Sequence, residues 1–202
     1  MNFENSQTKE NLARAFVTEC TDGARYQFMA KDAKAKGYGF ISNQLKMIAK
    51  NEMAHAAVFY NFILCNGKND CECASCGTQN IDVCAGLPFT SYVLPEGLKL
   101  TSDTEKFESD TLYKEFEETA LKEGFKDIAK AFHHVVQVEN CHHLMLGEYF
   151  AKMKSNTLYR MKQINKWKCS YCGTEIEQKE APKVCPLCSY EQGYFMVPTS
   201  DE

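Results

Sequence analysis

The feature that most constrains this chain is the recurrence of apolar residues at alternating steps of three and four positions. Three stretches show it and a fourth shows it more weakly, and such spacing is typical of helices that pack together through one stripe. The first two stripes consist of Leu12, Phe16, Glu19, Gly23, Tyr26 and Ala30, and of Ile41, Leu45, Ile48, Glu52, His55, Phe59 and Phe62. The other two consist of Glu105, Glu108, Leu112, Phe116 and Ala120, and of Ile128, Phe132, Val135, Glu139, His142, Leu146, Tyr149 and Met153. The sequence therefore predicts an all-α protein built on a four-helix bundle.

The connections between these stretches indicate the order in which the helices pack. Short turns at Gly37–Gly39 and at Gly124 make helices one and two, and three and four, antiparallel neighbours. The connector from 66 to about 102 is long enough to cross the whole bundle. We expect a bundle with one long crossover over 1–153, a linker over 154–166 and a small irregular or β module over 167–202.

Acidic and imidazole residues interrupt the apolar stripes, and this is the main pointer to chemistry. They are Glu19, Glu52, His55, Glu105, Glu108, Glu139 and His142. Five buried carboxylates would be prohibitive without compensation, whereas two divalent or trivalent cations would cancel their charge. A Glu on each of two helices and Glu-x-x-His on the other two is the ligand pattern of ferritin-like dimetal sites. The alternative is that these residues lie on solvated helix faces or are ordinary core histidines.

A second metal site is indicated by paired cysteines near the C-terminus. Cys169, Cys172, Cys185 and Cys188 form C-x2-C-x12-C-x2-C. Four thiolates in tetrahedral geometry suit iron or zinc, and the spacing does not choose between them. Iron is favoured beside a dimetal bundle that needs electrons, and a zinc ribbon is the alternative.

At these residues the chain resembles the rubrerythrin family. The motifs are E19-C-T-D-G-A-R-Y26, E52-M-A-H55, E105-K-F-E108-S-D-T-L-Y113, E139-N-C-H142 and the tail W167-K-C-S-Y-C-G…C185-P-L-C188. The tail is similar to the family's rubredoxin-type module, although Ser189 replaces a glycine common after the fourth cysteine in stand-alone rubredoxins.

The resemblance implies a role for each site residue. Glu52 and Glu139 would bridge two irons, and Glu19 would be a terminal ligand of one. Glu105 and His142 would be terminal ligands of the other iron. Glu108 and His55 match the pair that exchanges as an iron ligand between oxidation states, and Tyr26 and Tyr113 match the tyrosines that flank the site.

The function implied is a peroxidase that reduces hydrogen peroxide to water, with electrons delivered through the four-cysteine iron. The electron donor would be an NAD(P)H-dependent reductase or a small redox carrier, and the chain would form a homodimer, head-to-tail or domain-swapped. Two alternatives remain open from the sequence. One is a ferritin-like ferroxidase that handles iron, and the other is a zinc-ribbon interaction protein without catalysis.

Charge and composition exclude other classes of partner. The net charge of −4 gives no basic footprint for nucleic acid. The polar N-terminus lacks the apolar region of a secretory signal, and no stretch approaches the ~20 apolar residues that span a bilayer, so a cytoplasmic protein is expected. The crossover adds Cys65, Cys71, Cys73, Cys76 and Cys84. The run C71-E-C-A-S-C76 could hold zinc or another metal with Cys65 or Cys84, or it could be a redox-active or free thiol cluster. We favour no metal there, because the intervening residues offer no supporting framework.

Overall fold

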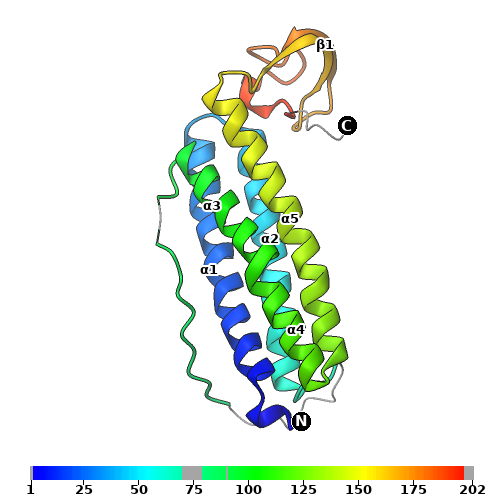
Figure 1. Ribbon diagram of the computed structural model, residues 1–202. Helices are drawn as coiled ribbons and strands as arrows, with labels where there is room; N and C mark the ends of the chain where they lie inside the picture. Colours follow the sequence, from blue (N-terminus) through cyan, green and yellow to red (C-terminus); the bar gives the residue numbers. More distant parts are fainter. Residues whose placement is uncertain (1, 70–78, 90, 198–202) are drawn as a thin grey trace. The chain divides into compact units, whose positions relative to one another are not determined.

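The structure is a computed structural model, and it describes residues 2–69, 79–89 and 91–197. Four long helical segments lie side by side, and a small sheet follows them (Figure 1). The helical elements are a 3-10 turn (Phe3–Asn5), α1 (Gln7–Ala35), α2 (Gly39–Leu64), α3 (Glu96–Phe107), a π-helical turn (Glu108–Leu112), α4 (Tyr113–Glu123) and α5 (Lys126–Lys154). They are followed by β1 (Arg160–Lys168), β2 (Glu175–Glu180) and a 3-10 turn (Gln192–Tyr194). The predicted all-α class is confirmed.

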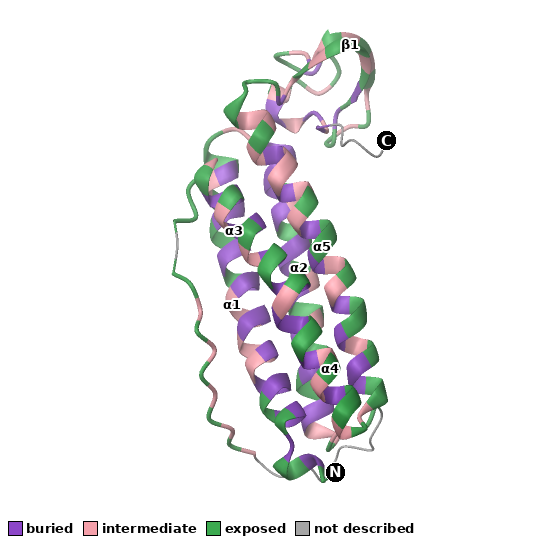
Figure 2. Ribbon diagram, viewed as in Figure 1, coloured by how far each residue is buried: buried purple, intermediate pink, exposed green. Residues whose placement is uncertain are grey.

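The predicted stripes form the buried faces of these helices, while the opposite faces are exposed (Figure 2). Leu12, Ile48 and Phe59 are fully buried. The stripe residues Glu19 and Glu139 are buried as deeply as their apolar neighbours, with 2% and 0% of their surface exposed. The stripes therefore carry ionisable side chains into the interior.

The third helical segment is not a regular α-helix, since a π-helical turn joins α3 to α4. Its stripe advances by four residues at each step from Glu108 to Ala120, which is longer than the 3.6-residue period of an α-helix. Over three turns the excess amounts to about one residue, and a π turn absorbs one extra residue. Both Glu108 and Tyr113, at either side of this turn, consequently remain buried.

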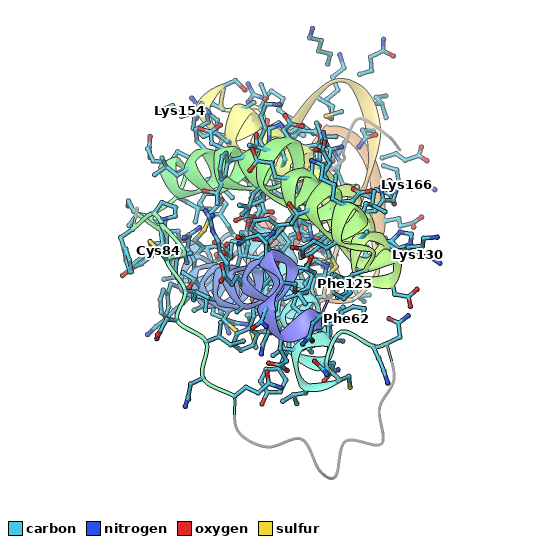
Figure 3. The ribbon with its side chains drawn as sticks, turned by 60° about the horizontal axis from the view of Figure 1, so that its bottom comes forward. Phe62, Cys84, Phe125, Lys130, Lys154 and Lys166 are labelled. Carbon is cyan, nitrogen blue, oxygen red and sulfur yellow. The ribbon has the colours of Figure 1, made fainter. Side chains whose placement is uncertain are left out.

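The chain divides into two compact units. The first contains Met1–Ala24, Ala49–Phe89 and Asp103–His143, and the second contains Arg25–Ile48, Thr90–Ser102 and Leu144–Glu202. In the first unit Phe59, Tyr113 and Phe132 form an aromatic core, with the rings of Phe59 and Phe132 5.0 Å apart. Phe62, near the end of α2, and Phe125, just before α5, lie at the end of these helices that faces the viewer in Figure 3. Every acidic and histidine residue of the four stripes lies within the first unit. This unit alone therefore contains the candidate dimetal site.

The crossover between α2 and α3 is extended in its described part. Ile81 and Val83 pack against the core of the first unit. Cys84, which directly follows Val83, is exposed on the connector (Figure 3). Helix α3 begins at Glu96, inside the stretch expected to be connector, directly after Pro95. Proline is favoured at helix starts because its fixed φ and missing N–H suit that position.

The C-terminal module is built on an antiparallel hairpin. β1 pairs with β2 so that Trp167 faces Ile176, and the first residues of β1 lie within the stretch expected to be linker. Trp167 is fully buried, and its indole N–H donates to the carbonyl of Gln178 over 3.0 Å. Trp167 and Phe195 thus provide a small core on which two of the cysteines, Cys169 and Cys185, are packed.

Among the described helices, none combines the length and the apolar character needed to cross a bilayer.

Candidate metal centres

Acidic and histidine residues of the stripes, from four helical elements, form two overlapping groups inside the first unit. The first group is Glu19, Glu52, His55 and Glu139, and the second is Glu52, Glu105, Glu139 and His142. Within each group one ligand atom per residue lies within 4.8 Å of every other. Glu52 and Glu139 belong to both groups, so the structure places two potential cation positions side by side with two carboxylates in common.

The imidazoles face the carboxylates through the same ring nitrogen. His55 Nδ1 lies 3.0 Å from Glu139 Oε1, 3.2 Å from Glu52 Oε2 and 3.3 Å from Glu19 Oε2. His142 Nδ1 lies 2.9 Å from Glu139 Oε2 and 3.1 Å from Glu52 Oε1. Each Glu-x-x-His pair shares one helix face because its members are three residues apart. The two motifs therefore confront one another from α2 and α5.

The donor set fits a pair of metal ions. The Oε1 atoms of Glu52 and Glu139 are buried and accept no hydrogen bond, although each lies near an imidazole nitrogen. A buried carboxylate oxygen without a donor is unfavourable unless a cation approaches it. Four ionised carboxylates in the two groups carry −4, which two divalent ions match with +4. Oxygen and imidazole ligands with shared carboxylates fit iron binding.

Without metal, the carboxyl groups must hold protons or contact imidazoles. Burial and neighbouring carboxylates raise the pKa values of Glu19 and Glu105 well above the usual range. Burial also opposes ionisation of Glu52, but contacts with His142 and His55 outweigh it and lower the pKa of Glu52 to about 2. For both imidazoles, burial is outweighed by contacts with the carboxylates, which raise the pKa values of His55 and His142 to about 12. Protons thus occupy positions that cations would take.

Glu108 is buried but belongs to neither group. Burial and the charge of Asp22 raise its pKa, with smaller effects from Glu105 and Glu19. Asp22 is itself buried, and the sequence reasoning did not single it out. Its place one turn after Glu19 on the same helix face was the available signal. Glu108 is therefore held at the edge of the cluster, at the start of the π turn.

The two tyrosines expected to flank the site have different surroundings. The Tyr113 hydroxyl donates a short hydrogen bond to Glu19 Oε1, and burial raises the pKa of Tyr113 well above its usual value. Tyr113 is therefore a neutral donor that orients Glu19. Tyr26 is also buried, two helical turns beyond Glu19 in α1.

Asn51 is a further residue that sequence reasoning missed. It directly precedes Glu52 in α2, and its Nδ2 lies 3.3 Å from His142 Nε2, the ring nitrogen that faces away from the carboxylates. The only signal in the sequence was its position beside a ligand motif.

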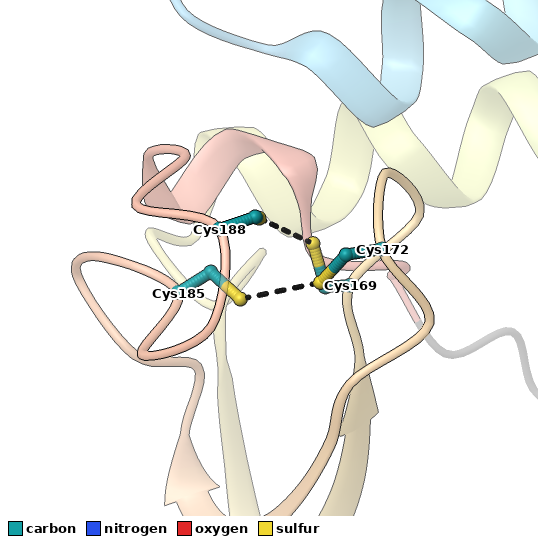
Figure 4. Close-up of side chains that lie close together, drawn as sticks. All are labelled: Cys169, Cys172, Cys185 and Cys188. Carbon is teal, nitrogen blue, oxygen red and sulfur yellow. Dashed lines mark hydrogen bonds between the residues drawn. The ribbon is translucent and has the colours of Figure 1, made fainter.

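The four-cysteine site is assembled in the C-terminal module. The Sγ atoms of Cys169 and Cys188 are 3.8 Å apart, and those of Cys172 and Cys185 are 3.6 Å apart (Figure 4). A tetrahedron with metal–sulfur bonds of about 2.3 Å has edges of about 3.8 Å. These two separations match the edge of such a tetrahedron, all four sulfurs lie within 4.8 Å of one another, and the cluster fits iron binding.

Backbone amides surround the sulfurs of this site. The N–H groups of Tyr171 and Cys172 are directed at Cys169, and those of Leu187 and Cys188 are directed at Cys185. Thr174 donates to Cys172 from its backbone and hydroxyl, and these bonds lower the pKa of the Cys172 thiol to about 6. Amides directed at thiolates stabilise their negative charge and tune a bound metal.

Two tight turns make this amide arrangement possible. Gly173 has a φ of 78°, as expected for a glycine placed to relax the turn, and Ser189 occupies the equivalent position in the second pair with a φ of 61°. A left-handed conformation is unfavourable for a residue with a Cβ atom. The substitution noted at Ser189 therefore preserves the turn but strains it.

The remaining cysteines form no metal group within the part of the chain that the structure describes. Cys65 is disulfide-bonded and Cys84 is a free, exposed thiol. Cys71, Cys73 and Cys76 lie outside the described residues.

Together, a helical bundle that buries two overlapping carboxylate–imidazole groups and a four-cysteine module define a ferritin-like iron protein with a rubredoxin-like tail. Residues 10–149 match the family model described as rubrerythrin, and residues 167–196 match the rubredoxin-like domain of rubrerythrin. The chain belongs to the rubrerythrin family.

Relatives support this assignment along almost the whole chain. Rubrerythrin-1 of Clostridium acetobutylicum is 34% identical over 196 residues, which cover 96% of each chain. Rubrerythrin of Clostridium perfringens is 31% identical over 199 residues, with 96% of each chain covered. Among solved structures, fully reduced nigerythrin has a TM-score of 0.59 at 20% identity, covering 98% of this chain and 94% of its own. Bacterioferritin of Desulfovibrio desulfuricans has a TM-score of 0.51 at 19% identity, covering 75% and 86%. The last two similarities show the fold.

Proposed function

We propose that this chain is a non-haem diiron peroxidase that protects against oxidative stress. The reaction is H2O2 + 2 H⁺ + 2 e⁻ → 2 H2O. The observation that carries the proposal is that Glu52 and Glu139 each belong to both buried groups. Two ions that share two carboxylates are close enough to act together on one small substrate.

The proposed ligands follow from the two groups and from the family resemblance. Glu52 and Glu139 would hold both metal ions, Glu19 would be a further ligand of one, and Glu105 with His142 would be further ligands of the other. His55 and Glu108 are alternative ligands of one position. A neutral imidazole suits the ferrous charge and a carboxylate suits the ferric charge, which gives a physical reason for having both side chains there.

The protein's own groups position the metal ligands and manage protons. The iron pair, when bound, supplies the two electrons that reduce the peroxide. The Tyr113 hydroxyl donates a hydrogen bond to Glu19 Oε1 and so fixes the orientation of that carboxylate. Tyr26 is proposed as the second tyrosine of the site, and Glu108, whose pKa is raised by burial and by Asp22, is suited to hold a proton near the cluster.

Electrons are proposed to arrive through an iron held by Cys169, Cys172, Cys185 and Cys188. An NAD(P)H-dependent reductase or a small redox carrier would reduce this iron one electron at a time. A cytoplasmic location belongs to the same proposal, because clustered thiols persist for metal binding in reducing compartments.

We further propose a homodimer in which the four-cysteine module of one chain serves the iron pair of its partner, head-to-tail or by domain swapping. A mixing experiment tests this arrangement. Cys185→Ser disables only electron delivery and Glu52→Ala only the metal pair, so neither variant alone turns over peroxide. Recovery of activity in re-formed mixed dimers supports transfer between chains, and continued inactivity contradicts it.

The peroxidase proposal is tested by anaerobic mixing of the iron-loaded, reduced protein with hydrogen peroxide while a reductase and NADPH regenerate it. We expect one NADPH consumed per peroxide, with His55 and Glu108 variants slowed more than their iron content falls. Oxidation of added ferrous iron into a mineral core, without NADPH-coupled peroxide loss, would instead identify an iron-storage protein.

A further inference from the structure

The two Glu-x-x-His motifs differ in what contacts the Nε2 atom of each histidine. His142 Nδ1 faces Glu139 and Glu52, while Asn51 lies on its opposite nitrogen at 3.3 Å. His55 Nδ1 faces the same carboxylates, but within the described residues its Nε2 has no hydrogen-bond partner. One imidazole is therefore held at both nitrogens and the other at one.

The residues that directly precede the two motifs differ in the same sense as this asymmetry. Asn51 directly precedes the motif Glu52–His55 in α2, and the residue that directly precedes Glu139–His142 in α5 is Val138. Asn51 reaches across to the histidine of the opposite motif. Val138, at the equivalent position, has only methyl groups and offers nothing that could hold His55 in return.

We propose that Asn51 is a positioning residue that fixes His142 as the permanent imidazole ligand of the metal pair, and that Val138 leaves His55 without such a restraint at its Nε2 atom. This inference rests on the proposed metal pair but not on the peroxide chemistry.

The chemistry of imidazole ligation explains the requirement. An imidazole that binds metal through Nδ1 carries its proton on Nε2, and that N–H needs an acceptor. The Asn51 side-chain amide lies 3.3 Å from His142 Nε2 through its Nδ2 atom. Because a half-turn of the amide exchanges its nitrogen and oxygen at the same place, Oδ1 accepts the Nε2 proton, both of the protonated imidazole in the metal-free chain and of the imidazole whose Nδ1 binds metal. Asn51 thus serves both states.

The burial of the two histidines agrees with this division of roles. The His142 side chain is 5% exposed and the His55 side chain is 13% exposed. The ring centres are 6.5 Å apart, so both rings lie in one cluster and differ in their restraint. His55, which is proposed to exchange with Glu108 as a ligand of one metal ion, needs fewer restraints. His142 is proposed to remain bound to the other ion and needs more.

The test uses zinc, which is diamagnetic and occupies nitrogen and oxygen sites without redox change. Full-length protein, loaded with three equivalents of Zn²⁺, is compared with Asn51→Val, Asn51→Asp and the control Asn140→Val. Asn140 is an exposed residue of α5 beside Glu139, so its variant repeats the change of residue type on a ligand helix. Histidine ¹⁵N spectra report which nitrogen binds zinc, and competition with a chelator reports affinity.

We expect His142 to bind through Nδ1 and to show a slowly exchanging Nε2 proton in the native chain and in Asn51→Asp. Asn51→Val should lose that slow exchange and weaken one bundle zinc site about 10- to 100-fold, with the other site and Asn140→Val unchanged. Binding of His142 through Nε2, or equal affinity and exchange in Asn51→Val, would overturn the inference. Failure of the native bundle to bind zinc at all would instead contradict the proposed metal pair.

The reciprocal variant Val138→Asn provides an independent check. A new acceptor behind His55 should slow exchange of its Nε2 proton in the zinc-loaded protein. No change in the His55 signals would contradict the claim that position 138 sets the freedom of this ring.

Discussion

Replacement of Glu52 should affect the whole metal pair, because Glu52, like Glu139, belongs to both ligand groups. Removing a terminal ligand such as Glu105 weakens one cation position, whereas Glu52→Ala removes a carboxylate from both. We therefore expect the native chain to retain two metal ions in the bundle, Glu105→Ala one and Glu52→Ala none.

The magnitude follows from the linkage between binding and folding. An ion present at 100 times its dissociation constant stabilises the folded state by about 2.7 kcal/mol, so two ions contribute roughly 5 kcal/mol. For a chain of this size each kcal/mol shifts the Tm by about 2–4 °C, which gives roughly 10–20 °C for the pair. Because removal of a buried charge can itself stabilise the metal-free chain, the relevant quantity is the difference in Tm with and without metal.

The assay is anaerobic thermal unfolding with and without ferrous iron, with metal analysis after desalting. Glu115→Ala, at an exposed position of α4, is the matched control and should keep the full iron-induced shift. Metal bound by the four cysteines contributes equally to all variants and cancels. A Glu52→Ala protein with the same shift and iron content as the native chain would refute the shared-carboxylate reasoning.

Four further predictions concern the pH dependence of stability, proton release on metal loading, Tyr113 and Ser189. The pKa values of His55 and His142, near 12, lie above the unfolded value of about 6.5, so their stabilising contacts are complete below pH ~6.5 and lost as pH rises; the Tm of the metal-free chain should fall between pH 7 and 10. Loading the bundle at pH 7 should release at least two protons per chain, which a weakly buffered indicator detects, and no release would contradict the protonated imidazoles. Tyr113→Phe leaves buried Glu19 without its donor and should lower the metal-free unfolding free energy by about 1–3 kcal/mol in urea; an unchanged midpoint is the contrary result. Ser189→Gly relieves a φ of 61° and should stabilise the four-cysteine module by about 1 kcal/mol, seen as slower metal loss to a chelator, whereas Ser189→Ala should give no gain.

The sequence predicted those parts of the molecule that follow from periodicity. A step of three or four residues places side chains on one helix face, so the stripes located the helices and the acids inside them. The four-cysteine site was also predictable from local sequence, because two C-x-x-C pairs close together in the chain can supply all four ligands of one tetrahedral metal ion.

Other features depend on contacts between segments far apart in the sequence. The contact of Asn51 with His142 joins α2 to α5, and the approach of Asp22 to Glu108 joins α1 to the π turn. Neither residue breaks an apolar stripe in a recognisable way. The repeated four-residue steps of the third stripe are consistent with the π turn. They did not predict it, because a four-residue step is also common in regular α-helices.

The boundaries of elements were the least predictable part. Helix α3 starts at Glu96, within a stretch whose Gly, Pro, Asn and Cys content indicated connector, and strand β1 starts at Arg160, within a stretch whose polar composition indicated linker. Strand β1 forms because its backbone pairs with β2, and its charged side chains lie on exposed positions that composition reads as linker.

The most direct measurement of the central claim is metal analysis with a visible spectrum of the protein purified without added metal. The account predicts three irons per chain and a red protein that reductant bleaches and hydrogen peroxide restores. A colourless protein that holds zinc at the four cysteines, has no metal in the bundle and leaves peroxide untouched would contradict it.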